Sequence, residues 1–543
     1  SVFSPCLPCC GGRDLFWSGK VCGTGNDRVA VHLRAAPFAA CGFFQYHGMN
    51  AEQFAWAYIK SEFLYPKRLL FQSEDLYHAC MEETLALGEK SQGDGAALMK
   101  KREQRARKKR MKQKRKREGV VRLIKTLQQA LKMDREKFKV PRSVQQAIPI
   151  QRIWPDGVFQ SGTKFSKTFR FSDINYAIAS KEDKTEMFLD YSELLNALDS
   201  GAAAKITLNN RRINKEEFEA SLLLPMKEDG LDEYRKEYNE MLLSKVSGTN
   251  NSIYQERYLT VSVHKKNIDE ARTYFARVGT DIITHLSKLS SIGEEMDAEQ
   301  RLQIFRDFFR ADEPQCFPFD MKAFAKKGSS FKDWICPQSM EFSKDCFKIN
   351  ERFGRVLYMQ DYASYVKDDM ISELCDLSRD LMLSIDILPV PTDEAVREIQ
   401  NRLLGVETNV TNWQRRQNAN NNFSAIVPYD MELQRKETKE MLDDLTTRDQ
   451  RMMFGILTMV HMADSKKQLD SDTESILSVA RKHLCQMATL KWQQVDGLNT
   501  VLPYGIRKIN ALRTLTTEST AVLILSILRR SCSRAVFIMG RMR

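Results

Sequence analysis

The sequence lacks the features that define several large functional classes. Its 543 residues contain no uninterrupted apolar run of about 18 residues or more, so a membrane-spanning helix is not predicted. Ser1–Gly19 has no basic start followed by an apolar stretch, and a secretory leader is therefore not predicted either. The chain also has no Gly-x-x-x-x-Gly-Lys-Ser/Thr or Gly-x-Gly-x-x-Gly string, the backbone cradles that hold nucleotide phosphates.

Motifs for hydrolytic and metal chemistry are missing as well. The seven histidines stand singly, without a His-Glu-x-x-His or Gly-x-Ser-x-Gly pattern. Cys6 and Cys9 form a Cys-x-x-Cys pair, but no second pair follows at the spacing that structural zinc requires. His264 and His461 fall at matching ends of two expected strands, and we interpret both as structural. We therefore expect no catalytic residue, no metal site, no cofactor and no enzymatic activity in this chain.

The positive charge of the chain is concentrated in one segment. Residues 100–117 contain thirteen Lys or Arg and one Glu, which accounts for the whole formal net charge of +12. The tract has no aromatic side chain that would stack on bases, so sequence-specific single-strand binding is not expected. Three interpretations stay open: contact with an anionic membrane surface or an acidic partner, non-specific nucleic-acid binding, and a solubilising arm. The candidate contact residues are Lys100, Lys101, Arg102, Arg105, Arg107, Lys108, Lys109, Arg110, Lys112, Lys114, Arg115, Lys116 and Arg117.

Regular elements are predicted from about residue 141, and one unit recurs. A strand with β-branched residues is followed by an amphipathic or capped helix three times. The three predicted pairs are 258–264 with 268–289, 381–390 with 392–404, and 451–462 with 467–484. Ser, Thr and Asp at alternate positions of these strands predict sheets that are covered on one face and open on the other. The expected fold class is α+β, with mixed or antiparallel sheets and a disordered basic arm near the N-terminus.

The same patterns divide the chain into expected parts. Residues 1–41 show no sustained periodicity and are expected to be unstructured, whereas Ala51–Phe63 predicts a short helix that ends at Tyr65-Pro66. The expected parts are 1–41, a short helical segment at 42–98, the basic arm and linker at 99–140, two α+β parts at 141–380 and 381–520, and an atypical basic tail at 521–543.

Four sequence strings, which follow one another between residues 144 and 522, resemble a known protein family in their order. They are AIPIQRIWPDGVFQ, KTFRFSDINYAIASKEDKTEMFLDYSELLNALD, YLTVSVHKKNIDEARTYFARVGTDI and LPYGIRKINALRTLTTESTAV. This order resembles the N-terminal region of the conjugative-transfer ATPases of type IV secretion systems, the CagE/TrbE/VirB family of Gram-positive mobile elements. In that family LPYG and LTTEST lead toward a motor domain that binds ATP and Mg²⁺. The chain ends before such a domain, so the resemblance implies an assembly module without the motor.

A second, shorter string resembles another family of the same systems. Residues 43–77, FFQYHGMNAEQFAWAYIKSEFLYPKRLLFQSEDLY, are similar to the cytosolic tail of PrgI-type membrane subunits. Residues 1–41 lack the apolar spans that precede this tail in PrgI-type proteins, and residues 523–543 depart from the ATPase pattern, so out-of-frame translation at the two ends is one hypothesis. Within the PrgI-like string, amphipathic aromatic residues beside lysine and arginine are typical of a membrane interface, although packing on the main body would explain them equally. The candidate interfacial residues are Phe54, Trp56, Tyr58, Phe63 and Tyr65.

Together the resemblances imply a role in docking a secretion motor. The expected partners are inner-membrane channel subunits of a conjugation apparatus, with homo-oligomerisation in the intact family member. The expected location is cytoplasmic and peripheral at the inner face of the cell membrane. Two alternatives stay open: an ATPase subunit whose motor domain is supplied outside this chain, and a non-specific nucleic-acid binder that uses residues 100–117.

Overall fold

A computed structural model describes residues 45–46, 49–71 and 140–528, with gaps at 173, 175–178, 213–222, 228–229, 249–252, 312–318, 322–323, 325–329, 364–368, 376, 378, 421–425 and 449. The chain divides into two compact units, Ser1–Ile59 and Lys60–Arg543, which are considered separately below. The expected unstructured part, the basic arm up to residue 139 and the end of the basic tail from residue 529 lie outside the described residues.

The first unit contains a hairpin and a helix. Strands β1 (Gln45–Tyr46) and β2 (Met49–Asn50) pair antiparallel, and α2 (Ala51–Ile59) follows directly. The chain continues as a π-helical stretch, η1 (Lys60–Leu64), which belongs to the second unit. The predicted helix over 51–63 is thus confirmed in two stretches, and it ends before Pro66 because proline restricts the residue before it to extended conformations.

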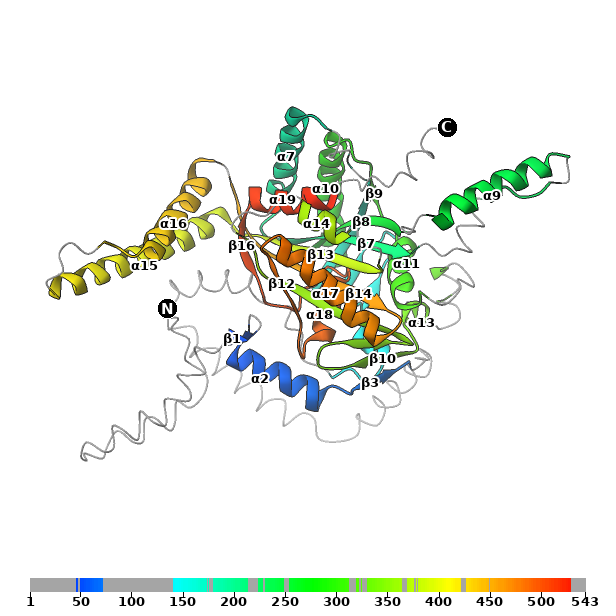
Figure 1. Ribbon diagram of the computed structural model, residues 1–543, viewed down its shortest axis with the longest axis horizontal. Coiled ribbons are helices and arrows are strands. Elements are labelled where there is room, and N and C mark those ends of the chain that lie inside the picture. The colour runs from blue at the N-terminus through cyan, green and yellow to red at the C-terminus, as the bar shows by residue number, and fades with distance from the viewer. Residues whose placement is uncertain are drawn as a thin grey trace, which may run out of the picture. The chain divides into compact units, whose positions relative to one another are not determined.

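The second unit is built on one antiparallel sheet (Figure 1). The 14-stranded sheet has the order β3-β10-β11-β12-β14-β13-β7-β8-β6-β5-β4, and β15, β16 and β9 pair with β12, β14 and β6. The strands are β3 (Arg68–Leu70), β4 (Arg152–Ile153), β5 (Phe159–Ser161), β6 (Lys164–Phe171), β7 (Ala202–Arg212), β8 (Ile253–His264), β9 (Gly293–Glu295), β10 (Ser339–Phe342), β11 (Phe347–Ile349), β12 (Arg352–Asp361), β13 (Leu381–Pro389), β14 (Met452–Ala463), β15 (Gln486–Thr489) and β16 (Arg513–Thr516).

Helices follow most of the long strands. The expected α+β class is confirmed, and so are the three strand–helix units, β8 with α10, β13 with α15 and β14 with α17. The helices are α6 (Val144–Ala147), α7 (Lys181–Asn196), α9 (Asp232–Gly248), α10 (Ile268–Lys288), α11 (Ala298–Phe309), α13 (Phe331–Ile335), α14 (Asp369–Cys375), α15 (Thr392–Ala419), α16 (Tyr429–Thr447), α17 (Lys466–Lys482), α18 (Gln494–Val501) and α19 (Thr517–Leu528).

The order of strands mixes the two expected α+β parts. Strands β13 and β14, from the part expected at 381–520, lie between β12 and β7, from the part expected at 141–380. Helix α19 runs to Leu528, past the start of the expected tail at 521, and Ala521 and Leu523 are buried in the core. Among the described residues, no helix is both long enough and apolar enough to cross a bilayer.

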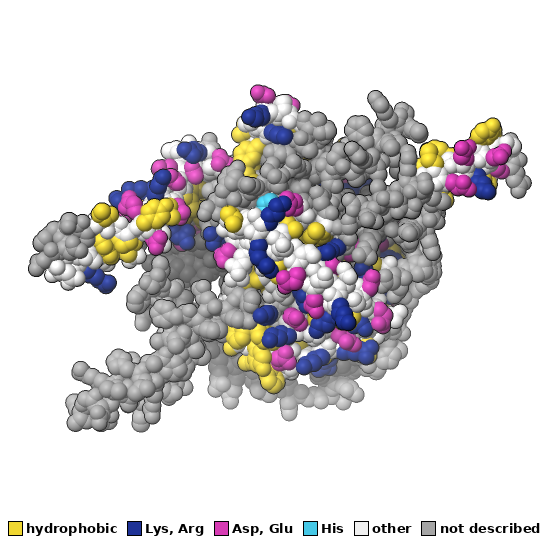
Figure 2. All heavy atoms as spheres, in the orientation of Figure 1, with side chains coloured by type: hydrophobic (Ala, Val, Ile, Leu, Met, Phe, Trp, Pro, Cys, Tyr) yellow, Lys and Arg dark blue, Asp and Glu magenta, His cyan; other side chains and the backbone are white. Residues whose placement is uncertain are grey.

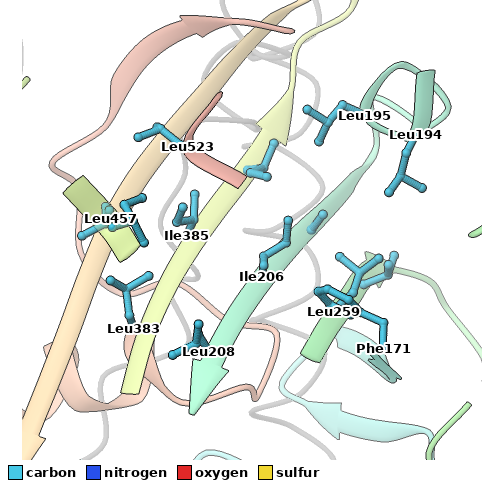
Figure 3. Packing of buried hydrophobic residues seen from close by; sticks show 14 of the residues in the cluster. Phe171, Leu194, Leu195, Ile206, Leu208, Leu259, Leu383, Ile385, Leu457 and Leu523 are labelled. Carbon is cyan, nitrogen blue, oxygen red and sulfur yellow. The ribbon is translucent and has the colours of Figure 1, made fainter. Parts of the chain in front are cut away.

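Two hydrophobic cores cover the two faces of the sheet. On one face, apolar side chains of the central strands pack against α7, α10, α14, α17 and α19. Figure 3 shows Ile206 and Leu208 of β7 beside Leu383 and Ile385 of β13 on this face. On the other face, Met382 of β13 belongs to a second core with α11, α13 and α18. The central strands are therefore buried on both sides.

The prediction that one face of the sheet is open to solvent was wrong. Ser384 and Asp386 of β13, Thr207 of β7 and Thr458 of β14 alternate with apolar residues, as solvent-facing residues would, but all four are buried. Residues 500–507, here called the covering segment, lie over this face, and their backbone carbonyls accept hydrogen bonds from Ser384 and from Lys205 of β7. Buried polar groups persist in a fold when they are paired in this way.

Helix α15 was also predicted too short. It was expected to end at Leu404 and to be capped by Thr392, but it continues to Ala419, its N-cap is Pro391 and no side chain caps it. Gly405 lies inside this helix, where glycine lowers helix stability without ending the helix. The extra length packs along α16 to form a helical hairpin, visible in Figure 1. Figure 2 shows apolar side chains interspersed with charges of both signs on this hairpin.

Candidate functional site

The sequence-predicted contact residues fall into two groups. The thirteen basic residues from Lys100 to Arg117 lie outside the described residues. The aromatic residues of the PrgI-like string are described. On α2, Trp56 is 51% exposed and Tyr58 is 40% exposed, whereas Phe54 is half-buried. Trp and Tyr side chains combine an apolar ring with a polar tip, and such side chains are typical of membrane interfaces and protein contacts.

The two aromatic residues that follow in the second unit differ from each other. Phe63 is exposed in η1, but Tyr65 is half-buried, and the ammonium of Lys60 lies 5.0 Å from its ring centroid. Lys60 also forms an ion pair of 2.6 Å with Asp496. Burial raises the pKa of the Tyr65 hydroxyl above its usual value. Tyr65 is therefore held beside Lys60, which anchors this stretch to α18 of the second unit through Asp496.

A buried arginine holds the covering segment from one side. Arg301 of α11 donates hydrogen bonds to the carbonyl oxygens of Gly157 (2.6 Å), Ser166 (2.8 Å) and Pro503 (3.4 Å). Its guanidinium carbon lies 3.9 Å from the centroid of the Phe159 ring, which adds a cation–π contact. Burial lowers the pKa of Arg301 to about 9, so the side chain stays charged at neutral pH.

A buried lysine holds the segment from the other side. Lys205 of β7 donates to the carbonyl oxygens of Thr500 and Ile506, and it lies 3.3 Å from Oδ1 of Asp386. An ammonium group has three donors, and these three acceptors use all of them. Burial raises the pKa of Asp386 and lowers the pKa of Lys205, and the attraction between the two opposes both shifts. Ser384 adds a hydrogen bond of 2.5 Å to the carbonyl of Val501.

Gly505 allows the covering segment to approach the sheet. Its φ is +79°, a left-handed conformation that side chains disfavour, and a Cβ there would lie 2.7 Å from Cβ of Ser166 and 3.0 Å from Cβ of Ser262. The preceding Tyr504 stacks on Phe305, with ring centroids 4.5 Å apart. The Leu-Pro-Tyr-Gly string therefore forms a buried turn whose residues have distinct packing roles.

A small cavity with a mixed polar and apolar lining lies beside this turn. Its volume is about 70 Å³, and it is lined by Lys164 of β6, His264 of β8, Asp386 of β13 and Gly505, Ile506 and Arg507 of the covering segment. Oδ2 of Asp386 is buried and has no hydrogen-bond partner among the described residues. Among the described residues, no three or more His, Cys, Asp or Glu side chains are placed to hold a metal ion.

The two histidines that we interpreted together have different environments. His264 is exposed at the cavity rim, where its Nδ1 lies 3.1 Å from Oγ1 of Thr163. His461 is fully buried, and its Nε2 lies 3.1 Å from Oγ1 of Thr473, which also accepts a hydrogen bond from Arg355. Burial, reinforced by Arg355 and Arg379, lowers the pKa of His461 to about 3.

The buried His461 predicts a loss of stability in mild acid. Below about pH 6.5 the unfolded chain binds a proton at this position that the folded chain does not bind, so stability falls by about 1.4 kcal/mol per pH unit as the pH decreases toward 3. We expect urea unfolding of the wild type to lose about 1 kcal/mol more between pH 7.0 and 5.5 than that of His461→Asn. The exposed control His264→Asn should retain the wild-type dependence; identical pH profiles for wild type and His461→Asn would contradict the assignment.

Sequence reasoning did not find the charged groups around the covering segment. The partners Ile506 of Lys205 and Pro503 of Arg301 follow 301 and 202 positions later, so no local pattern connects them. The available signal was Lys205 within an apolar strand together with the polar residue Asp386 in another, because unpaired charges are seldom buried.

Comparison with known families finds a similarity in the N-terminal part of the chain. Residues 13–71 match the PrgI family, described as PrgI family protein, a family associated with type IV secretion and conjugation. The match begins before Phe43, where the resemblance in the sequence begins, and includes the whole of α2 and β3. No curated protein matches the chain.

Proposed function

We propose that the chain is a docking component of a conjugative type IV secretion apparatus. In this proposal the PrgI-like segment contacts channel subunits at the inner face of the cell membrane, and the α+β body is the assembly module that resembles the N-terminal region of the conjugative-transfer ATPases. The match of residues 13–71 to the PrgI family is the observation that carries the proposal. Homo-oligomerisation of the body is part of the same proposal.

The exposed aromatic residues of α2 support a contact role for the PrgI-like segment. Trp56 and Tyr58 are large side chains with exposed apolar area, and aromatic anchors of this kind contribute much of the binding energy at many interfaces. Within the second unit, Lys67 pairs with Glu62 and Arg68 pairs with Glu341. The basic residues of this stretch are thus partly neutralised, which favours a protein partner over an anionic lipid surface.

The proposal includes no ATP hydrolysis by this chain. Phosphoryl transfer requires groups that hold the β- and γ-phosphates with Mg²⁺, and the sequence contains no glycine-rich phosphate string. We expect no magnesium-dependent phosphate release from ATP by the purified chain. Measurable turnover would instead support the alternative of an ATPase subunit.

The docking role is tested by binding to membrane vesicles. Vesicles from cells that carry the conjugation apparatus should retain the full chain several-fold better than vesicles from cells that lack it. The double variant Trp56→Ser/Tyr58→Ser should reduce retention to the level of the vesicles without the apparatus, because both contact rings are lost. Leu189→Ser is the matched control, since Leu189 is a similarly exposed apolar residue on α7, and it should bind as the wild type does.

Two outcomes would contradict this role. Equal retention by both kinds of vesicle would assign the binding to lipid, and equal retention of the double variant and the wild type would remove α2 from the contact. If retention also disappears when DNA is digested, the non-specific nucleic-acid interpretation of residues 100–117 replaces the proposal.

A further inference from the structure

Strand β3 lies at one end of the strand order of the sheet, beside β10, and it comes from the PrgI-like part of the chain. The two strands pair antiparallel, with Leu69 directly opposite Met340. Beyond the paired residues, the backbone N–H of Phe71 donates a hydrogen bond of 2.8 Å to the carbonyl of Gln338. The PrgI-like segment is thus joined to the sheet edge as an added strand, which is the geometry by which sheets capture extended peptides.

The side chains of β3 have different environments on the two sides of the strand. Leu69 is 1% exposed and belongs to the same hydrophobic core as Met340, whereas the next residue, Leu70, is 52% exposed. Arg68 also faces outward, where it forms an ion pair of 3.0 Å with Glu341 of β10. In strand addition, backbone pairing gives affinity and the buried alternate positions give specificity. The edge of β10 therefore selects an apolar side chain at the central position of the added strand.

The same segment has a second anchor on the body. Lys60 forms an ion pair of 2.6 Å with Asp496 of α18, and the two side chains are 15% and 17% exposed. Ion pairs that are partly shielded from water are stronger than fully exposed ones. Residues 60–71 therefore contact the rest of the second unit at two places, and this fixes the direction as well as the register of the added strand.

The connection between this segment and the rest of the fold is long. Residues 72–139 separate it from residue 140, where the described residues resume. A connection of this length determines how often the segment meets the sheet edge, but the contacts themselves must select the position and the register. The same contacts are therefore available to an equivalent segment on a separate polypeptide.

We propose that the edge of β10 is a docking site for the corresponding segment of a separate PrgI-type polypeptide. The strand of this partner pairs with Ser339–Phe342 in place of β3, its leucine enters the core beside Met340, and its upstream lysine pairs with Asp496. The inference rests on the proposed function, because the segment that occupies the edge is the end of the match to the PrgI family. In this chain β3 competes with the partner for the edge.

Binding of a fluorescent peptide of residues 60–71 to the full chain tests the site. Leu69→Ser in the chain weakens β3 and opens the edge, so the peptide should bind this variant about tenfold tighter or more than the wild-type chain. The same substitution in the peptide should weaken its binding to the variant by about tenfold or more. Leu70→Ser is the matched control in either molecule, because Leu70 is exposed, and it should behave as the wild type does.

A second variant opens the site without changing the core. Lys60→Gln in the chain weakens the competing segment but leaves Asp496 available to the peptide, so the wild-type peptide should bind about threefold tighter than it binds the wild-type chain. Lys67→Gln is the matched control, since this side chain is 74% exposed and pairs with Glu62 inside the segment. Anisotropy of the labelled peptide measures both, and Lys60→Gln gives the test if Leu69→Ser does not fold.

Three results would overturn the proposal. Two are equal binding of the peptide to the wild-type chain and the opened variants, and equal binding of the wild-type and Leu69→Ser peptides. The third comes from mixing a Leu70→Cys chain with a Ser339→Cys chain, since these positions lie opposite each other. A disulfide between them in two different chains would make a second copy the occupant. The peptide lacks Trp56 and Tyr58, so failure of these tests leaves the vesicle experiment unaffected, and the reverse also holds.

Discussion

Replacing Arg301 by methionine is expected to lower the free energy of unfolding by about 4 kcal/mol. Methionine retains much of the volume and the contact with Phe159, but it removes the donors for the carbonyls of Gly157, Ser166 and Pro503. A buried carbonyl that loses its donor costs about 1–3 kcal/mol, and the relaxation of Pro503, whose bond is the longest, reduces the total. Equilibrium urea unfolding measures the change.

Arg277→Met is the matched control for this prediction. Arg277 forms an ion pair of 2.6 Å with Asp199, but its side chain is 63% exposed, so water replaces the lost interaction. The expected loss is less than about 1 kcal/mol. If the two substitutions have similar effects, the hydrogen bonds of Arg301 do not stabilise the covering segment as described.

Replacing Gly505 by alanine should destabilise the chain by about 3 kcal/mol. Part of the loss comes from the φ of +79°, which costs an L-residue about 1–2 kcal/mol, and the rest from the approach of the new Cβ to Ser166 and Ser262. Both contacts involve Cβ atoms fixed to β6 and β8, so the covering segment must shift. The same urea experiment detects the change.

Replacing Gly405 by alanine is expected to stabilise the chain instead. No atom of the described residues lies within 4 Å of a Cβ added at this position in α15, and alanine is the better helix former, so stability should rise by about 0.5–1 kcal/mol. A destabilised Gly405→Ala, or a Gly505→Ala as stable as the wild type, would contradict the local geometry described for that glycine.

The sequence predicted the helices and strands whose apolar residues recur at regular spacing. Helix α10 buries Ala271, Phe275, Ile282 and Leu286 at helical spacing, and its predicted range agrees with the structure within one residue. The end of α15 was missed because Gly405 resembles a stop signal locally, whereas packing against α16 stabilises the longer helix. Periodicity is a local property, so it identifies elements better than it identifies their ends.

The burial of both faces of the sheet and the position of the covering segment could not be predicted from the sequence. The reason differs from the one that applies to the helix ends. Alternating Ser384 and Asp386 in β13 are equally compatible with solvent and with a polar layer inside the protein. The choice depends on residues 500–507, more than a hundred positions later in the chain, which supply the acceptors for Ser384 and Lys205. The interfacial role of the aromatic residues stays a prediction, and the structure adds that Trp56 and Tyr58 are exposed.

The pairing of strands remote in sequence has a consequence for how the polypeptide acquires its structure. Strand β7 pairs with β13, β3 pairs with β10, and β14 pairs with β16 near the end of the described residues. During synthesis β7 is therefore complete well before its neighbour β13 has been made, and contacts between distant residues form slowly. Until then β7 and β8 present uncovered apolar surface, so newly made chains should depend on chaperones more than helical proteins of equal length do.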